Sequence, residues 1–92
     1  MGFERILKMY EEKLYFNTLE DVKRFVNLAM LKNYELDLIS GKYTVNAKSI
    51  MGIFSLDLTK PCLLRANTND ENELNTLKNE IAEFVYKEET ND

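Results

Sequence analysis

The sequence has no histidine, no tryptophan, one cysteine and one proline among its 92 residues. Without histidine, the chain has no imidazole for general acid–base catalysis, for metal coordination or for accepting a phosphoryl group on nitrogen. A single cysteine forms neither an intramolecular disulfide nor a multi-cysteine metal site. We therefore expect a protein that holds no metal, uses no cofactor and is not an enzyme.

Basic residues and long apolar runs are also scarce. The chain has 12 Lys and Arg residues against 16 Asp and Glu residues, which gives a formal net charge of −4. This balance argues against direct nucleic acid binding, because phosphate contacts need a basic face. The longest uncharged apolar run, from Ser49 to Leu56, is too short to span a bilayer, and the charged N-terminus does not fit a secretion signal. We expect a cytoplasmic protein that does not bind membranes.

The remaining composition is that of a small globular protein. Hydrophobic residues make up 45% of the chain, too many for intrinsic disorder, and the length allows one domain with a modest core. We predict a single domain over residues 1–88 and a polar C-terminal tail over residues 89–92.

The first third of the chain predicts a strand followed by a helix. Over Glu4–Phe16, Leu7 and Met9 alternate with Lys8 and Tyr10, as in a half-buried strand, although a helical reading of this segment is also open. Apolar residues then recur at helical spacing and predict a helix over Leu19–Lys32. Thr18 is the expected N-cap of this helix, and Asp21 stands three residues later, as the acid of a capping box does.

The middle of the chain predicts a hairpin and a short helix. Polar and apolar residues alternate on both sides of the turn at Ser40–Lys42, which favours a hairpin over residues 35–46. Ser49 is then well placed to cap a short helix. In that helix, Ile53 and Leu56 are expected to face the core, whereas Ile50 and Phe54 share another face.

The last third predicts a strand and a helix. Pro61 ends the preceding helix, and Cys62, Leu64 and Ala66 alternate as the inward residues of a strand, which makes Cys62 a buried structural thiol. An apolar stripe at helical spacing then predicts the final helix: Leu74, Leu77, Ile81, Phe84 and Val85. The order βαββαβα indicates an α+β protein with helices packed on one face of a sheet.

This order and one motif together resemble the HPr family, the phosphocarrier proteins of the bacterial sugar phosphotransferase system. The motif is Val-Asn-Ala-Lys-Ser-Ile-Met-Gly over residues 45–52, followed by Ser55 and Leu56. The resemblance implies an HPr-like open-faced β-sandwich, with a four-stranded antiparallel sheet and three helices on one face. It also implies a bacterial, cytoplasmic protein.

The chain departs from the family at the phosphocarrier site. Family members carry a histidine at the N-terminus of the first helix, within a Gly-Leu/Ile-His-Ala-Arg-Pro-Ala pattern. Counting back from Ser49 places that position at Thr18, and Glu20 stands near the position of the pattern's arginine. The chain therefore resembles a divergent member without histidine phosphocarrier activity, comparable to relatives of the regulatory Crh kind.

The resemblance assigns a regulatory role to Ser49. In the family, an HPr kinase/phosphorylase modifies this serine with ATP, and the phosphorylated protein is a corepressor for a LacI-type transcriptional regulator. The resemblance also implies that Ile50, Met51 and Phe54 contact protein partners, with Lys48 beside them. Two other readings remain open: a phosphorylation-independent binding or oligomerisation module, and a phosphotransfer component that uses Thr18 or Ser49 as an unconventional acceptor.

Overall fold

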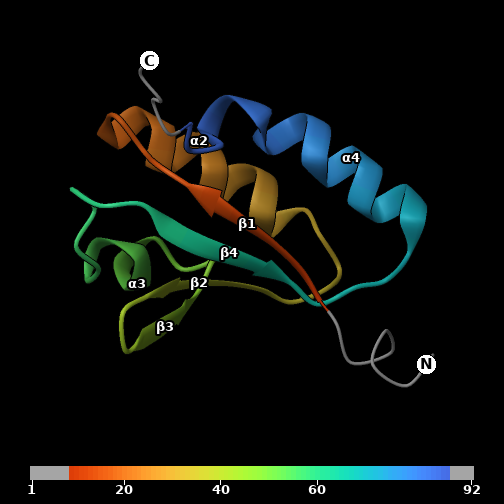
Figure 1. The fold of residues 1–92 in the computed structure, drawn as a ribbon, viewed down its shortest axis with the longest axis horizontal. Coiled ribbons are helices and arrows are strands. Elements are labelled where there is room, and N and C mark those ends of the chain that lie inside the picture. Colours follow the sequence, from red (N-terminus) through yellow and green to blue (C-terminus); the bar gives the residue numbers. More distant parts are fainter. Residues whose placement is uncertain (1–8, 88–92) are drawn as a thin grey trace, which may run out of the picture.

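The computed structural model describes residues 9–87, which form a four-stranded antiparallel sheet covered by helices (Figure 1). Residues 4–8 of the expected first strand and the expected tail, 89–92, lie outside the described residues. The elements confirm the predicted order, and in sequence they are β1 (Tyr10–Leu14), α2 (Leu19–Met30), β2 (Leu36–Ser40), β3 (Tyr43–Asn46), α3 (Ile50–Phe54), β4 (Cys62–Ala66), α4 (Glu71–Ile81) and the 3₁₀-helix η1 (Ala82–Phe84).

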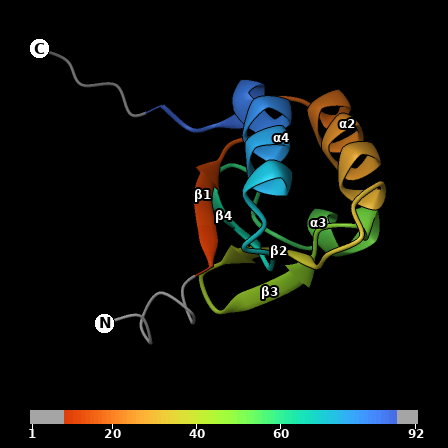
Figure 2. The same ribbon diagram turned by 90° about the vertical axis from the view of Figure 1, so that its right-hand side faces the viewer.

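The strands lie in the order β1-β4-β2-β3, and every neighbouring pair is antiparallel. Helices α2 and α4 lie side by side over one face of this sheet, and α3 lies next to α2 and β3 (Figure 2). The inward residues of β4 are Cys62, Leu64 and Ala66, as predicted, and all three are buried. A sheet of this kind has one face packed on helices and one face open, which explains the alternation along its strands.

The core contains no buried polar or charged side chain among residues 9–87. Three phenylalanines meet in it, from the β1–α2 connection, α2 and η1, with ring centroids 5.3 Å apart for Phe16 and Phe25, and 5.5 Å apart for Phe16 and Phe84. Such tilted aromatic pairs add to the stabilisation that area burial provides.

Burial also raises the pKa of the Cys62 thiol to about 11, which keeps the thiol protonated and unreactive at neutral pH.

The hairpin between β2 and β3 turns at Gly41 and Lys42, where the sequence predicts it. Gly41 has a φ of +61°, and no non-glycine residue has a positive φ in the described part of the chain. A positive φ at the first central position alone is the type II′ pattern, which favours glycine and suits the twist of the flanking strands.

Two predicted elements differ from the structure. Met9 was predicted to be an inward residue of the first strand, but it precedes β1 and is 41% exposed. Tyr10 and Leu14 face inward instead, so the predicted alternation is shifted by one residue. The last helix ends at Ile81, and η1 replaces the regular turn that the apolar stripe predicted. The tighter turn places Phe84 in the aromatic cluster and lets Val85 form a bridge to Leu14 on the free side of β1.

Within residues 9–87, no helix combines the length and the apolar character that crossing a bilayer requires.

Candidate functional site

The N-terminus of α2, where the resemblance places a phosphocarrier site, is closed by its own side chains. Thr18 has extended backbone geometry (φ −141°), and its Oγ1 accepts a hydrogen bond from the Asp21 backbone N–H at 3.1 Å. The Asp21 carboxylate in turn accepts from the Asn17 backbone N–H at 3.0 Å. The first bond confirms Thr18 as the N-cap, and the two bonds together engage the backbone N–H groups of Asn17 and Asp21.

The charges around this N-terminus also oppose an anion. Asp21 forms an ion pair with Arg24 at 2.6 Å, and the same guanidinium reaches Glu83 at 2.8 Å and lies over the Phe84 ring. Glu20 adds a second carboxylate in the first turn of the helix. A dianionic phosphoryl group here would face two acidic side chains, and the nearest arginine is already bonded to carboxylates.

The N-terminus of α3 has the same kind of cap but lacks the acidic residues of α2. Ser49 is exposed, and its Oγ accepts from the Gly52 backbone N–H at 3.0 Å, which confirms it as the cap. No acidic residue lies in the first turn of α3. A Cβ on Gly52 would lie 3.2 Å from the Ser49 Oγ and 3.3 Å from the Val45 Cβ, so glycine allows the close approach of the capping hydroxyl.

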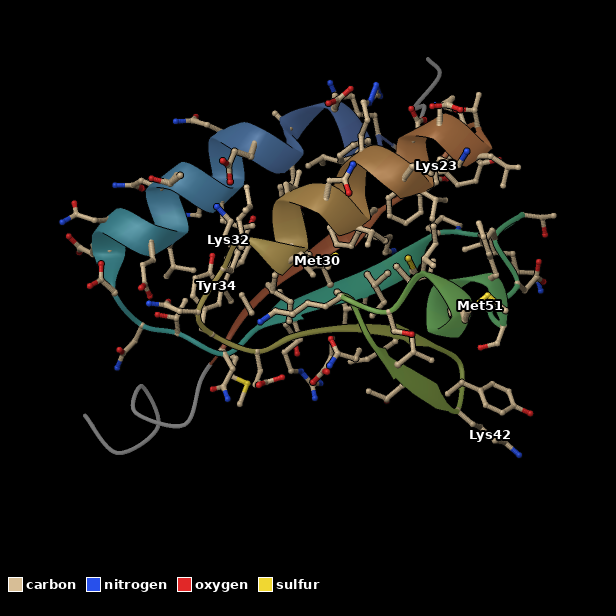
Figure 3. All side chains as sticks on the ribbon, turned by 180° about the vertical axis from the view of Figure 1, so that it is seen from behind. Lys23, Met30, Lys32, Tyr34, Lys42 and Met51 are labelled. Carbon is tan, nitrogen blue, oxygen red and sulfur yellow. The ribbon has the colours of Figure 1, made fainter. Side chains whose placement is uncertain are left out.

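Helix α3 has a buried face and an exposed face. Ile53 is fully buried and Leu56, just beyond the helix, is 8% exposed, so both face the core as predicted. Met51 is 74% exposed and Phe54 is 40% exposed, while Ile50 is half-buried against the core. We call Ile50, Met51 and Phe54 the α3 surface. Figure 3 shows Met51 projecting from it on the side of the molecule that also displays the end of α2.

Lys48 connects the start of α3 to the end of α2. Its backbone N–H donates to the Asn46 side chain at 2.8 Å, and its ammonium donates to the Lys32 backbone carbonyl at 2.9 Å. Helix α2 has no basic residue in its last turn, so Lys48 supplies the positive charge that the carbonyl end of a helix favours. No local pattern predicts this contact, which depends on how the two helices pack.

Among residues 9–87, no group of three or more cysteine, aspartate and glutamate side chains is arranged to hold a metal ion. The predicted site residues thus separate into two regions. Ser49 and the α3 surface lie together on one short helix, and Lys48 lies beside them with its charge directed to α2. Thr18 lies at the opposite, N-terminal end of α2.

Comparison with known proteins supports the fold. No family model matches the sequence, and no curated protein matches it. Among solved structures, the crystal structure of HPr-C-His from Thermoanaerobacter tengcongensis matches with a TM-score of 0.64 and 26% sequence identity, over 83% of this chain and 92% of that chain. The fold is therefore HPr-like, with the expected four-stranded antiparallel sheet and three helices, and it suggests a protein related to the phosphotransferase system.

Proposed function

We propose that the protein is an HPr-like regulatory or interaction protein, related to the bacterial phosphotransferase system, that does not carry phosphoryl groups on histidine. It acts in the cytoplasm by contact with other proteins and is not itself a catalyst. The observation that carries this proposal is the contrast between the two helix N-termini. An exposed hydroxyl caps each helix, but the first turn of α2 carries Glu20 and Asp21, whereas the first turn of α3 carries no acid. Helix α3 also exposes Met51 and Phe54.

Ser49 is the proposed switch, phosphorylated from ATP by an HPr kinase/phosphorylase. The hydroxyl is exposed, and its phosphorylation disrupts the capping hydrogen bond that it accepts from the Gly52 backbone N–H. A phosphoryl group there adds a charge of about −1.5 to −2 and three acceptor oxygens at neutral pH. Because the first turn of α3 carries no acid, the new charge meets no carboxylate in that turn.

The α3 surface is the proposed docking site for protein partners, including the kinase and a transcriptional regulator. Methionine and phenylalanine are adaptable, high-area contact residues at protein interfaces. Met51 and Phe54 are exposed two and five residues after Ser49, so a phosphoryl group on Ser49 changes the charge at the edge of this surface. Lys48 contributes by holding the start of α3 against α2.

The switch is tested by intact mass measurement after incubation with ATP and an HPr kinase/phosphorylase. The matched control is Ser55, an exposed serine at the other end of α3, whose hydroxyl donates to the Gly52 carbonyl. We expect the wild type and Ser55→Ala each to gain one phosphoryl group, and Ser49→Ala to gain none. Equal phosphorylation of Ser49→Ala would place the modified residue elsewhere.

The docking surface is tested by the affinity of the same kinase for variants that place a charge on exposed apolar positions. Phe54→Asp changes the α3 surface, whereas Leu31→Asp changes a residue that is 84% exposed at the end of α2. We expect Phe54→Asp to weaken binding at least about tenfold, as for loss of an aromatic contact at an interface centre. Leu31→Asp should change it less than about twofold. Equal effects of both variants would contradict a docking site on α3.

A phosphorylation-independent binding module on the same fold is the second candidate. It is favoured by the Ser49 cap bond, because a serine that only caps α3 needs no other function. This candidate predicts no mass increment for folded wild-type protein and unchanged partner binding in Ser49→Ala. An unconventional phosphoryl acceptor at Thr18 finds less support, since that hydroxyl caps α2 beside two carboxylates.

A further inference from the structure

The two edges of the sheet differ in how they are covered. At the β1 edge, Leu14 forms a bridge to Val85, and the Tyr86 backbone N–H donates to the Lys13 carbonyl at 2.9 Å. At the β3 edge, no segment within residues 9–87 pairs with the outer side of the strand (Figure 1). An open edge presents unpaired N–H and C=O groups to which a further strand can bind.

The sequence of β3 carries none of the features that protect an edge strand. Its residues, Tyr-Thr-Val-Asn, include no charge and no proline, whereas β1 carries the charged residues Glu11, Glu12 and Lys13. The register of β3 against β2 is regular, so no bulge interrupts it. Natural proteins use charges, prolines or bulges on exposed edges to prevent pairing, so β3 is an unprotected edge.

The hydrogen-bond pattern of the hairpin identifies the free backbone groups of β3. The Ala47 backbone N–H donates to the Leu36 carbonyl at 2.8 Å, and bonded positions alternate along an antiparallel pair. The backbone groups of Thr44 and Asn46 therefore point away from β2. The Asn46 carbonyl accepts from the Ser49 backbone N–H at 3.0 Å. Thr44 thus offers both its N–H and its C=O to a further strand, and Asn46 offers its N–H.

These free groups fit a second copy of the same strand. Two antiparallel β3 strands with Thr44 opposite its own equivalent exchange two hydrogen bonds between the Thr44 residues. Tyr43 of each copy then lies opposite Val45 of the other copy, which forms an aromatic and β-branched pair of the kind that stabilises sheets. Because Lys42 lies opposite Asn46 in this register, no like charges meet within the strand pair. The pairing also covers Tyr43, which is 69% exposed in the single chain.

We propose that the protein forms a two-fold symmetric dimer through β3, which joins the two sheets into one continuous antiparallel sheet. The same strand contributes to both sides of this interface, and the bridge to Val85 together with the charges of β1 opposes pairing at the other edge. The assembly therefore ends at two copies. The dimer does not require phosphorylation of Ser49, so it stands or falls independently of the proposed switch. Because a single strand pair buries a small area, we expect a Kd on the order of 100 µM.

The test is sedimentation velocity on the full, unmodified chain from about 50 µM to about 1 mM, on either side of the expected Kd. We expect the sedimentation coefficient to rise from that of a monomer toward that of a dimer. Over the same range, amide hydrogen exchange followed by nuclear magnetic resonance should slow about threefold at Thr44, because only the monomer exposes that N–H. Exchange at Glu11 on the β1 edge should not change. A chain that remains monomeric at about 1 mM overturns the proposal and leaves the edge to a strand of another protein. A dimer with unchanged exchange at Thr44 overturns it as well.

Two variants of Thr44 test the backbone contact. Thr44→Pro removes the outward N–H, and because this group points away from β2, the change removes no hydrogen bond within the hairpin. We expect it to weaken the dimer at least about tenfold. Thr44→Val keeps the N–H and the β-branched shape, so it should change the Kd less than about twofold. Equal Kd values for the two variants overturn the pairing through β3.

A second pair of variants keeps the test decisive even if Thr44→Pro fails to fold. Tyr43→Lys places a charge opposite Val45, as natural edge strands do to prevent pairing, and should weaken the dimer at least about tenfold. The matched control is Leu31→Lys, which makes the same kind of change at a residue that is 84% exposed at the end of α2. It should change the Kd less than about twofold. Equal effects of Tyr43→Lys and Leu31→Lys overturn the location of the interface.

Discussion

Helix α3 has only five residues, and Ile53 is its one buried residue. A helix this short is not stable alone and depends on tertiary packing. Ile53→Ala removes three carbon groups, worth about 0.8 kcal/mol each in transfer free energy, or about 2.4 kcal/mol together. The cavity left behind raises the expected loss to about 2–4 kcal/mol. Met51→Ala, in the same helix but at a position that is 74% exposed, should change the free energy of unfolding by less than about 0.5 kcal/mol.

Urea unfolding followed by far-ultraviolet circular dichroism measures both variants. A domain of this length is expected to unfold with a free energy on the order of 5–14 kcal/mol, so Ile53→Ala should remain folded without denaturant. A free energy of unfolding for Ile53→Ala within about 1 kcal/mol of the wild-type value would refute the dependence of α3 on Ile53. An equal loss of unfolding free energy in Met51→Ala and Ile53→Ala would refute it as well, because α3 would then not depend on its one buried residue.

Three further predictions concern local features. Thr18→Ala should cost about 1 kcal/mol in urea unfolding by loss of the α2 cap, whereas Thr18→Ser should cost little; equal losses would contradict the capping role. Gly41→Ala should lower stability by about 1–2 kcal/mol because of its positive φ, and an unchanged urea midpoint would refute that strain. The Cys62 thiol has a folded pKa of about 11, above its unfolded value near 9, so its contribution to stability is complete below pH 9 and is lost as the pH rises toward 11. Iodoacetamide should label Cys62 slowly at pH 8 unless urea is present, and fast labelling of the folded protein would contradict its burial.

Much of the fold could be predicted because the residues that form its turns, helix caps and strands carry local signals in the sequence. The hairpin at Gly41 has turn chemistry, Thr18 and Ser49 have cap positions, and Cys62 lies in a clear alternation. The end of α4 could not be predicted this way. Phe84 keeps helical spacing in sequence, but the chain tightens into η1 there so that this ring reaches Phe16.

The candidate sites also contain some features that local patterns predict and others that depend on contacts between distant segments. Ser49 and the exposed positions of α3 follow from a local motif and from the spacing of the short helix. The cap of α2 also follows from a local pattern, whereas the ion pair between Arg24 and Glu83 joins residues far apart in the sequence and could not be predicted. The Lys48 contact with Lys32 depends on packing between elements, and no sequence pattern predicts it.

The proposal that the chain has exchanged histidine phosphotransfer for a serine switch is tested most directly by offering the protein both phosphoryl donors in parallel. One sample receives ATP and an HPr kinase/phosphorylase, and the other receives phosphoenolpyruvate and the enzyme that it charges in the phosphotransferase system. Intact and fragment masses are then measured. We expect one phosphoryl group, located on Ser49, in the ATP sample and none in the phosphoenolpyruvate sample. A phosphoryl group gained from phosphoenolpyruvate, or one gained from ATP at a residue other than Ser49, would contradict the account.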